Sequence, residues 1–505
     1  MARSRPDTTS PKSPLILTID IGTSSTRAIL FDATAHVVEG MVEQRQSQMM
    51  TTPDGGAIFD ADQILADTIE VIDALLKRAG ELAGQIGAVA VDTLVGNLLG
   101  VDEQGKAVTP VFTYADTRNA NVTQALRQGL GQAGAREAHD RTGCLIHTSY
   151  IPSRFCWLAD EQSEWFQAAT RWVSIGEYIY YHFFDEWRVS YSVASWTGML
   201  NRRDLEWDSG WLERLPITKE QLSPLGDLNT PLQGLQGQWA QRWPALAEVP
   251  WLLPIGDGAA ANIGSGCDAP NRIALTMGTT GAMRVVVGPE LKQVPDGLWL
   301  YRVDRSRALL GGATTEGGNL FAWLNTLLRL PEGEALEEAL TERAPTAHGL
   351  TILPFVAGER APGWREDARA AINGLSLHTQ PIDILQAGLE AIAYRFSLIY
   401  QRIASQLPSG TDHEIIAGGG ALLSSPAWLQ IMADVLGRPL HTLAEKEGTS
   451  RGLALLALEQ LGVIPRPAAL SPALGTTYLP NAKHHALHQE ALARQVELYN
   501  RLLNS

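Results

Sequence analysis

Two short segments of the chain combine a glycine with neighbouring hydroxyl groups in a way that suits phosphate binding. One, Asp20 to Arg27, reads DIGTSSTR, and the other, Met277 to Arg284, reads MGTTGAMR. Each lies between two apolar stretches, which predicts a β-hairpin whose turn offers backbone N–H groups and lets a phosphate approach the main chain at glycine. A single turn of this kind is equally typical of ordinary hairpin chemistry. Because the chain carries the pattern twice, we interpret it as two lobes that bind one polyphosphate.

Two aspartates near these turns have the chemistry for catalysis. Asp20 lies two residues before Gly22, whereas the second copy has Thr276 at the matching position. A carboxylate there suits Mg²⁺, which prefers hard oxygen ligands and keeps several of its waters. Asp257, in the stretch PIGDGAAANIGSG, follows an apolar strand and precedes the second hairpin. It is placed to accept a proton from a substrate hydroxyl, although an aspartate between glycines is also typical of a turn or a helix cap.

Three further motifs each have a functional and a structural interpretation. The glycine triplet in AGGGALLSS (417–425) lets the backbone pass close to a flat ligand, or serves a turn and helix packing. GERAPGW sets Glu359 beside Arg360, which is also typical of a structural ion pair. TYADTR (113–118) and ASWTGMLN (194–201) mix small polar residues with aromatics. That mixture suits a polyhydroxylated ligand, but it also suits ordinary loops whose aromatic rings belong to the core.

Two α/β domains are needed to position these motifs. A chain of 505 residues is too long for one hydrophobic core and suits two domains of about 250 residues each. The order of strand, strand, helix and strand after the first hairpin is typical of an α/β lobe. The middle region, 119–251, is rich in Trp and helix formers and is interpreted as an elaboration on the first lobe. The expected elements after the first hairpin are a helix at 61–78, strands at 86–91 and 414–416, and helices at 426–436 and 450–461.

Composition restricts the partners of the protein. A formal net charge of −15 and a pI near 5.2 argue against nucleic acid or an anionic membrane surface as a partner. The sequence has no apolar run long enough for a transmembrane helix and no apolar core of a secretion signal, so we expect a cytoplasmic protein. The three cysteines, Cys144, Cys156 and Cys267, lack metal-ligand spacing and are expected to be buried thiols.

Taken together, these motifs resemble the FGGY family of carbohydrate kinases, within the actin, hexokinase and heat-shock ATPase superfamily. The similarity runs from about Leu15 to Leu461: DIGTSSTR resembles the first phosphate motif, MGTTGA the second, AGGGALLSSPAWLQIMADVLGRPL the adenosine motif and GDG the catalytic-base motif. The resemblance implies a two-lobed ribonuclease H-like fold with a duplicated core and an interlobe cleft. The expected domains are a disordered tail (1–14), a sugar-binding N-terminal domain (15–264), a nucleotide-binding C-terminal domain (265–470) and a helical extension (471–505).

The resemblance also implies roles for individual residues. Asp257 is implied as the catalytic base, and Asp20 and Asp257 as ligands of Mg²⁺. The implied ATP-binding residues are Gly22, Thr23, Ser24, Ser25, Arg27, Gly278, Thr279, Thr280, Gly418, Gly419, Gly420 and Ser424. The implied substrate-binding residues are Asp257, Gly258, Tyr114, Asp116, Gly96 and Asn97. Family members often form homodimers.

The middle region and GERAPGWREDAR are most similar to gluconokinases, with one departure that bears on the substrate. Gluconokinases and xylulokinases typically carry a Met-His pair where this chain has Val95 and Gly96, so the usual sugar-contacting imidazole is missing. Glycerol kinases are less similar, since Gly258 stands where they carry Gln. Smaller departures from the family pattern are Arg154 in place of Lys and the unusual Gly388.

The expected function is transfer of the ATP γ-phosphoryl group to a terminal hydroxyl of a small open-chain sugar acid, with gluconate first and xylulose or another ketose or polyol as the alternative. Two other classes of protein remain compatible with the duplicated hairpins. One is an actin-type or chaperone-type ATPase, which needs no small-molecule acceptor. The other is a catalytically silent sugar sensor, although retention of both Asp20 and Asp257 argues against it.

Overall fold

The computed structural model describes residues 11–408, 410, 412–444 and 447–503, and the chain divides into two compact units. Unit 1 contains the chain up to Gly264, Tyr301–Arg307 and Glu447–Ser471. Unit 2 contains Ser265–Leu300, Ala308–Lys446 and Pro472–Ser505. Most of the expected tail, residues 1–10, lies outside the described residues. Two segments that follow the second hairpin in the chain therefore belong to unit 1.

Unit 1 is organised around a five-stranded sheet in the order β14-β6-β1-β2-β3. Its strands are β1 (Leu15–Ile21), β2 (Ser25–Phe31), β3 (Val37–Gln46), β6 (Ile86–Thr93) and β14 (Ile255–Gly256). The first two form the predicted antiparallel hairpin, while β6 and β14 continue the sheet in parallel. Every residue of β1 is buried, as expected for an apolar strand in the middle of a sheet.

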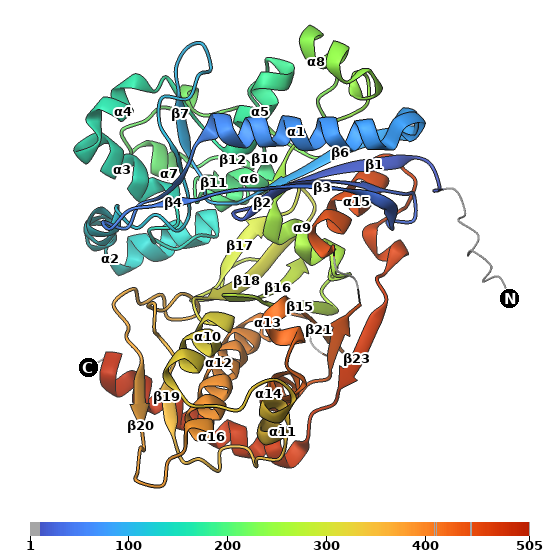
Figure 1. The fold of residues 1–505 in the computed structure, drawn as a ribbon. Helices are drawn as coiled ribbons and strands as arrows, with labels where there is room; N and C mark the ends of the chain where they lie inside the picture. The colour runs from blue at the N-terminus through green and yellow to red at the C-terminus, as the bar shows by residue number, and fades with distance from the viewer. Residues whose placement is uncertain (1–10, 409, 411, 445–446, 504–505) are drawn as a thin grey trace, which may run out of the picture. The chain divides into compact units, whose positions relative to one another are not determined.

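Helices cover this sheet. The predicted first helix is confirmed as α1 (Ala61–Ala79), which begins at Asp60, whose side chain accepts a hydrogen bond from the Gln63 N–H. It packs on β2 and β3, and Figure 1 shows it running along the sheet. The later helix α15 (Gly448–Gln460) packs on β1 and β6. Both helices thus bury apolar side chains against the strands that carry the first hairpin.

Two helices of unit 1 cross at glycines. A Cβ on Gly264, the last residue of α9 (Asp257–Gly264), would lie 1.7 Å from the Gly448 carbonyl oxygen. A Cβ on Gly452 would lie 1.9 Å from the Ala260 carbonyl oxygen. Backbone therefore packs directly on backbone where α9 meets α15, and only glycine fits at either position.

The middle region adds helices and short sheets to unit 1, as predicted. A separate apolar cluster contains Trp157, Trp172, Trp207 and Trp211, whereas Trp243 and Trp251 belong to the main core of the unit. The aromatic residues of the two small-polar motifs are less buried than a core interpretation requires, since Tyr114 is 37% exposed and Trp196 is half-buried. The helices are α2 (Ala120–Thr142), α3 (Ile151–Glu161), α4 (Ser163–Ala168), α5 (Ile175–Phe184), α6 (Tyr191–Trp196), α7 (Ser209–Leu212) and α8 (Gly237–Arg242). The short strands within this region are β9 (Arg171–Val173), β10 (Val189–Ser190), β11 (Leu200–Asn201), β12 (Glu206–Trp207) and β13 (Leu225–Gly226), and those that precede it are β4 (Met50–Thr51), β5 (Ala57–Phe59), β7 (Leu99–Val101) and β8 (Val111–Phe112).

Unit 2 repeats the arrangement around the second hairpin. Its sheet has the order β17-β18-β16-β15-β21-β22-β23, in which β15 and β16 are antiparallel and β21 lies parallel to β15. The strands are β15 (Arg272–Met277), β16 (Gly281–Val287), β17 (Trp299–Arg302), β18 (Ala308–Thr314), β21 (Glu414–Gly418), β22 (Leu440–Leu443) and β23 (Leu474–Tyr478), with β19 (Thr351–Leu353) paired to β20 (Ala371–Asn373). The last two residues of β17 are assigned to unit 1. The helices are α10 (Gly318–Leu327), α11 (Glu334–Thr341), α12 (Pro381–Ala404), α13 (Gly420–Leu423), α14 (Pro426–Leu436) and α16 (Ala482–Leu503).

The predicted fold class is confirmed. Both units are α/β, and each centres on an antiparallel hairpin with a parallel strand beside its first strand. The helix expected at 426–436 has the same bounds in the structure, and the one expected at 450–461 begins two residues earlier. Cys144 and Cys267 are buried as expected, whereas the expectation is wrong for Cys156, which is only half-buried. Among the helices described, none is long and apolar enough to cross a membrane.

Candidate active site

The turn of the first hairpin presents backbone and hydroxyl donors. Ile21 pairs with Thr26, so the turn spans residues 22–25, and the Gly22 N–H donates to the Ser25 carbonyl over 3.0 Å. Ser24 is exposed, and Gly22 and Thr23 are partly exposed. The turn therefore has unburied N–H and hydroxyl groups of the kind that bind phosphate oxygens.

Three carboxyl groups gather where the parallel strands of unit 1 end. Strand pairing sets Asp20 of β1 beside Asp92 of β6, and Asp92 beside Ile255 of β14. Asp257 follows β14 directly as the first residue of α9. Because carboxyl ends of parallel strands share one edge of a sheet, residues distant in sequence are brought together here.

Asp92 is the most perturbed member of this acidic group. It is fully buried, and neither of its carboxyl oxygens has a hydrogen-bond partner in the protein. Burial, followed by the negative charges of Asp20 and Asp257, raises the pKa of Asp92 well above its usual value. The Asp20 and Asp92 carboxyls are close enough to share a proton, which gives a hydrogen bond only while one of them is protonated. Sequence reasoning missed Asp92, although it is the penultimate residue of its strand, as Asp20 is of β1.

Arg27 balances part of this negative charge. Its Nη2 donates to Asp20 Oδ2 over 2.5 Å, and its Nη1 donates to Glu447 Oε2 over 2.8 Å. Burial alone would lower the pKa of Arg27, but the carboxylates of Asp20 and Glu447 outweigh that effect and raise it. Arg27 therefore stays cationic beside the turn and orients Asp20.

The turn of the second hairpin is built differently. Met277 pairs with Gly281, so this turn spans residues 278–280, and the Gly278 N–H donates to the Thr280 carbonyl over 2.9 Å. Thr279 and Thr280 are both exposed. The turn is supported from behind by the start of α10, since the Asn319 N–H donates to the Thr279 carbonyl over 3.0 Å.

The glycine triplet lies against this second hairpin. Gly419 has φ +88°, and a Cβ on it would lie 2.4 Å from the Met277 carbonyl oxygen, so only glycine fits. A Cβ on Gly418, Gly420 or Gly278 would meet no atom within 4 Å. The backbone at these three glycines therefore borders open space, as a nucleotide that rests on the main chain requires. Ser424, nearby, is exposed and donates to the Ala421 carbonyl over 3.0 Å.

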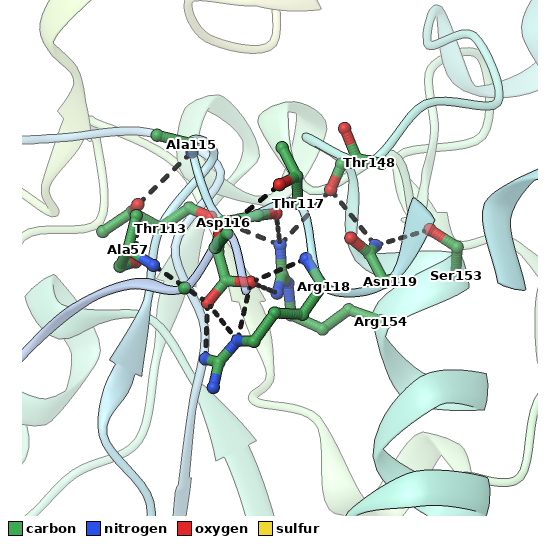
Figure 2. Close-up of polar contacts among 12 residues, drawn as sticks. Ala57, Thr113, Ala115, Asp116, Thr117, Arg118, Asn119, Thr148, Ser153 and Arg154 are labelled. Atoms are coloured by element: carbon green, nitrogen blue, oxygen red, sulfur yellow. Dashed lines mark hydrogen bonds and ion pairs between the residues drawn. The ribbon is translucent and has the colours of Figure 1, made fainter. Parts of the chain in front are cut away.

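Asp116 anchors a buried network in unit 1 (Figure 2). Its carboxylate accepts from Arg118 Nη2 over 2.6 Å and lies 3.3 Å from Arg154 Nη1. Burial opposes ionisation of Asp116, but the two arginines outweigh it and lower the pKa of this carboxyl. Arg154, whose pKa burial lowers to about 10, also donates to the carbonyls of Thr113 and Thr148. The Arg at this position thus ties together the loops that flank Tyr114, which is itself 37% exposed.

The remaining predicted substrate residues lie close to β6 and β14. Both ends of the buried Asn97 side chain are engaged, since Nδ2 donates to the Leu94 carbonyl and Oδ1 accepts from the Ile175 N–H. Gly258 is buried, and its N–H donates to Asp257 Oδ1 over 2.6 Å. Gly96 has φ +62°, in the left-handed region that favours glycine.

The structural interpretation of GERAPGW allows an ion pair between Glu359 and Arg360, but the ion pair observed for Glu359 is with Arg395. Glu359 accepts from Arg395 of α12 and from the Tyr499 hydroxyl of α16, so Arg360 is not its partner. Sequence reasoning also missed Glu316, which is 3% exposed and lies just after β18. Burial raises the pKa of Glu316 to about 8, and the negative charge of Glu359 adds to the effect.

Both halves of the chain match models of one protein family. Residues 15–264 match the model of the N-terminal domain of the FGGY family of carbohydrate kinases, and residues 273–460 match the model of its C-terminal domain. The chain is 28% identical over 479 residues to a gluconokinase of Bacillus subtilis (strain 168), which covers 92% of this chain and 91% of that protein.

Solved structures agree with this similarity. A gluconate kinase from Lactobacillus acidophilus superposes with a TM-score of 0.88 at 25% identity, covering 97% of this chain and 98% of that one. A ligand-bound xylulose kinase from the same organism superposes with a TM-score of 0.88 at 26% identity, covering 97% and 99% of the two chains.

Proposed function

The chain belongs to the FGGY family of carbohydrate kinases, and we propose that it transfers the γ-phosphoryl group of ATP to a terminal hydroxyl of gluconate. The observation that carries the proposal is the position of Asp257 at the end of β14, beside the acidic pair of Asp20 and Asp92. Similarity to gluconokinases over nearly the whole chain favours an open-chain sugar acid as the acceptor.

Asp257 is the proposed catalytic base. Its carboxylate accepts the proton of the acceptor hydroxyl while that oxygen bonds to the γ-phosphorus and the bond to the ADP oxygen breaks. The Gly258 N–H, which donates to Asp257 Oδ1, holds the carboxylate in a fixed orientation.

The hairpins and the glycine triplet are the proposed nucleotide-binding elements. Phosphoryl transfer asks little covalent chemistry of the protein, so catalysis depends on positioning and on stabilising charge. The N–H and hydroxyl groups of the unburied turn residues Thr23, Ser24, Thr279 and Thr280 bind phosphate oxygens. Gly418 and Gly420, which border open space, carry the adenosine, and the exposed Ser424 borders the same surface.

The residues of unit 1 fit the divalent metal that family members generally use with ATP, and we assign it as Mg²⁺. Among the described residues, no group of three or more His, Cys, Asp or Glu side chains is arranged to hold a metal ion alone. Mg²⁺ bound with a nucleotide typically takes only one or two carboxylates and completes its shell with phosphates and waters. Asp20 and Asp257 are the proposed ligands, and the buried Asp92, whose raised pKa favours its neutral form, lies beside them. When bound, Mg²⁺ neutralises charge on the phosphates.

Asp116 and Asn97 are proposed to position the substrate site. The Asp116 carboxylate contacts the guanidinium groups of Arg118 and Arg154, and the Asn97 amide makes hydrogen bonds to backbone groups. Both therefore hold loops in place, and the exposed Tyr114 is proposed to contact the ligand.

A panel of acceptors tests the substrate. ATP consumption is measured with gluconate and other aldonates, xylulose and other ketoses, and polyols, and the phosphorylated product is identified by mass. We expect the highest kcat/KM with gluconate. Preference for xylulose would reassign the acceptor within the family, and ATP turnover that no acceptor increases would refute the kinase activity of this chain.

The role of Asp257 is tested by Asp257→Asn. A general base typically contributes about 10² to 10⁴ in rate, so we expect kcat to fall by that factor with the KM for ATP little changed. Ser265→Ala, just beyond the end of α9, is the control variant, because Asn262 within the helix is buried. Near-normal turnover of Asp257→Asn would remove Asp257 from this role.

A further inference from the structure

A stacked pair of aromatic rings lies in unit 1 close to the proposed base. Trp196, the last residue of α6, stacks on Tyr301 with ring centroids 3.7 Å apart and an interplanar angle of 22°. Tyr301 is 2% exposed, and its hydroxyl lies 2.6 Å from the Tyr150 hydroxyl. The stack is therefore held from one side by buried groups, whereas Trp196 itself is only half-buried.

This stack borders the residue immediately before Asp257. A Cβ on Gly256 would lie 2.6 Å from Trp196 Nε1 and 2.7 Å from Val95 Cγ1. The backbone that positions Asp257 is thus in direct contact with the indole edge and with Val95. Trp196 and Val95 are therefore close neighbours of the residue proposed to accept the hydroxyl proton.

Gly96 leaves little space for a side chain at this point. A Cβ there would lie 3.0 Å from the Ser149 carbonyl oxygen and 3.2 Å from Tyr114 Cβ, and the backbone has φ +62°. A side chain at position 96 would be crowded and strained, so the wall on this side of the site comes from other residues. Trp196 and Val95 are the side chains that supply it.

Neighbouring hydrogen bonds fix the stack. The Arg302 N–H donates to Ser195 Oγ over 2.9 Å, which links the residue after Tyr301 to the residue before Trp196. The guanidinium of Arg302 donates to the Arg202 carbonyl, so the segment is anchored at a second point. A wall held in this way has a defined shape before substrate arrives.

We propose that Trp196, backed by Tyr301 and flanked by Val95, determines which acceptors this kinase accepts, by packing against the carbon chain of the sugar acid and limiting its length. This inference rests on the proposed function, since it names a specificity-determining residue of the same acceptor site. The indole gives a large rigid surface for C–H groups at low cost in side-chain entropy. Removing it leaves space into which a longer acid fits.

Steady-state kinetics with gluconate and a seven-carbon aldonate test the inference. Trp196→Ala is expected to raise the KM for gluconate about tenfold or more, because loss of well-packed apolar contact in a pocket costs at least that factor. The KM for ATP is expected to stay unchanged, and the preference for the six-carbon over the seven-carbon acid to fall by a similar factor. Trp196→Phe, which keeps an aromatic wall, is expected to retain most of the preference.

Two further variants control for folding. Val95→Ala removes two methyl groups from the same wall with little risk to the fold, and is expected to weaken the preference in the same direction by a smaller factor. Trp187 stacks on Tyr181 with centroids 3.9 Å apart, and Tyr181 borders Gly105 rather than Gly256. Trp187→Ala therefore removes a matched stacked tryptophan and is expected to leave the acceptor preference unchanged.

The outcomes separate this inference from the proposed function. If the wild-type enzyme phosphorylates gluconate and neither Trp196→Ala nor Val95→Ala alters the gluconate KM or the chain-length preference, Trp196 does not determine specificity, while the proposed function stands. An equal change in Trp187→Ala would also overturn it, because the effect would then belong to general destabilisation. A wild-type enzyme that phosphorylates no sugar acid refutes both, without any variant being needed.

Discussion

The two hairpin regions occupy matching places in their sheets but differ in the chemistry they present. β1 lies between β2 and β6, as β15 lies between β16 and β21. In unit 1 the strand register sets Asp20 beside Asp92, whereas in unit 2 it sets Thr276 beside Gly418. The first region thus places two carboxyls at the strand ends, and the second places a hydroxyl and a glycine there.

The turns differ as well. Residues 22–25 form the first turn and 278–280 the second, so the first is one residue longer. As a result Asp20 lies opposite Arg27, with which it pairs, while Thr276 lies opposite Ala282. What the two regions share is a glycine-containing turn that exposes N–H and hydroxyl groups. The shared turn suits phosphate binding in general. The charged groups found only in the first region suit chemistry at a metal-bound phosphate.

The largest effect is expected from removing charge in the first region. Asp20→Asn keeps the shape of the side chain but removes a proposed metal ligand and the partner of Arg27. We expect kcat to fall by about 10² or more, since loss of one group that stabilises transition-state charge has that magnitude. The dependence of the rate on Mg²⁺ concentration is expected to shift to higher concentrations, with the gluconate KM nearly unchanged. Magnesium titrations of initial rate measure both.

Thr276→Val is the matched control for Asp20→Asn. It removes the polar group at the corresponding position of the second hairpin while keeping the side-chain volume. Less than a threefold change in kcat is expected. A loss as large as that of Asp20→Asn would mean that the two regions contribute alike, and a change in Asp20→Asn confined to the gluconate KM would move Asp20 to the sugar site.

A smaller effect is expected from filling the open space of the second region. Gly420→Ala places a methyl group where no protein atom lies within 4 Å, so the fold tolerates it. If the adenosine rests there, the KM for ATP is expected to rise about tenfold, as for other small steric changes in a binding pocket, with the melting temperature preserved. Kinetics at varied ATP and thermal unfolding measure the two quantities.

Gly419→Ala gives the opposite pattern and so sharpens this test. Its Cβ would lie 2.4 Å from the Met277 carbonyl oxygen at φ +88°, so the substitution destabilises the folded protein. We expect a lower melting temperature for Gly419→Ala even without nucleotide. An unchanged KM for ATP in Gly420→Ala would exclude the triplet as the nucleotide surface.

Local patterns predicted much of this architecture from the sequence. The repeated turns predicted both hairpins, and proline at the start with glycine after the end predicted α14 at the bounds observed. Asp92 was out of reach because its significance comes from β1, β6 and β14 lying side by side, a pairing that joins residues far apart in sequence. The return of Glu447–Ser471 to unit 1 likewise depends on α15 packing on α9 through Gly452, which no local pattern encodes.

The same limit applies to the site. Hydroxyls and glycines in the turns were identified because their chemistry follows from residue type. For Asp116, Asn97 and Glu359 residue type was insufficient, because each carboxylate or amide is directed to partners elsewhere in its unit. The Trp196–Tyr301 stack is a further case, since it joins α6 to a short segment beyond the second hairpin.

The smallest effect is expected from Glu316, the buried carboxyl behind the second hairpin. Its pKa of about 8 in the folded chain exceeds the value of 4.5 for an exposed glutamate, because burial and then the charge of Glu359 disfavour ionisation. The folded chain therefore holds this proton where the unfolded chain has released it, and stability is lost as the pH rises from about 4.5 to about 8. Glu316→Gln removes that loss. We expect its melting temperature to exceed that of the wild type at pH 8.5 by about 2–4 °C, and the two to agree at pH 5.

The Glu316 test bears on the comparison because a protonated Glu316 brings no negative charge to the second hairpin at neutral pH. The exposed Glu332, in the same unit, gives the matched control Glu332→Gln, for which no pH-dependent difference is expected. If Glu316→Gln follows the wild type at every pH, Glu316 is ionised in the folded protein. The second region would then carry a buried charge of its own, close to a turn whose Thr279 carbonyl accepts from Asn319, three residues beyond Glu316. The two regions would then no longer differ in having an acidic group. They would differ only in where the carboxyl lies relative to the turn, in front of it for Asp20 and behind it for Glu316.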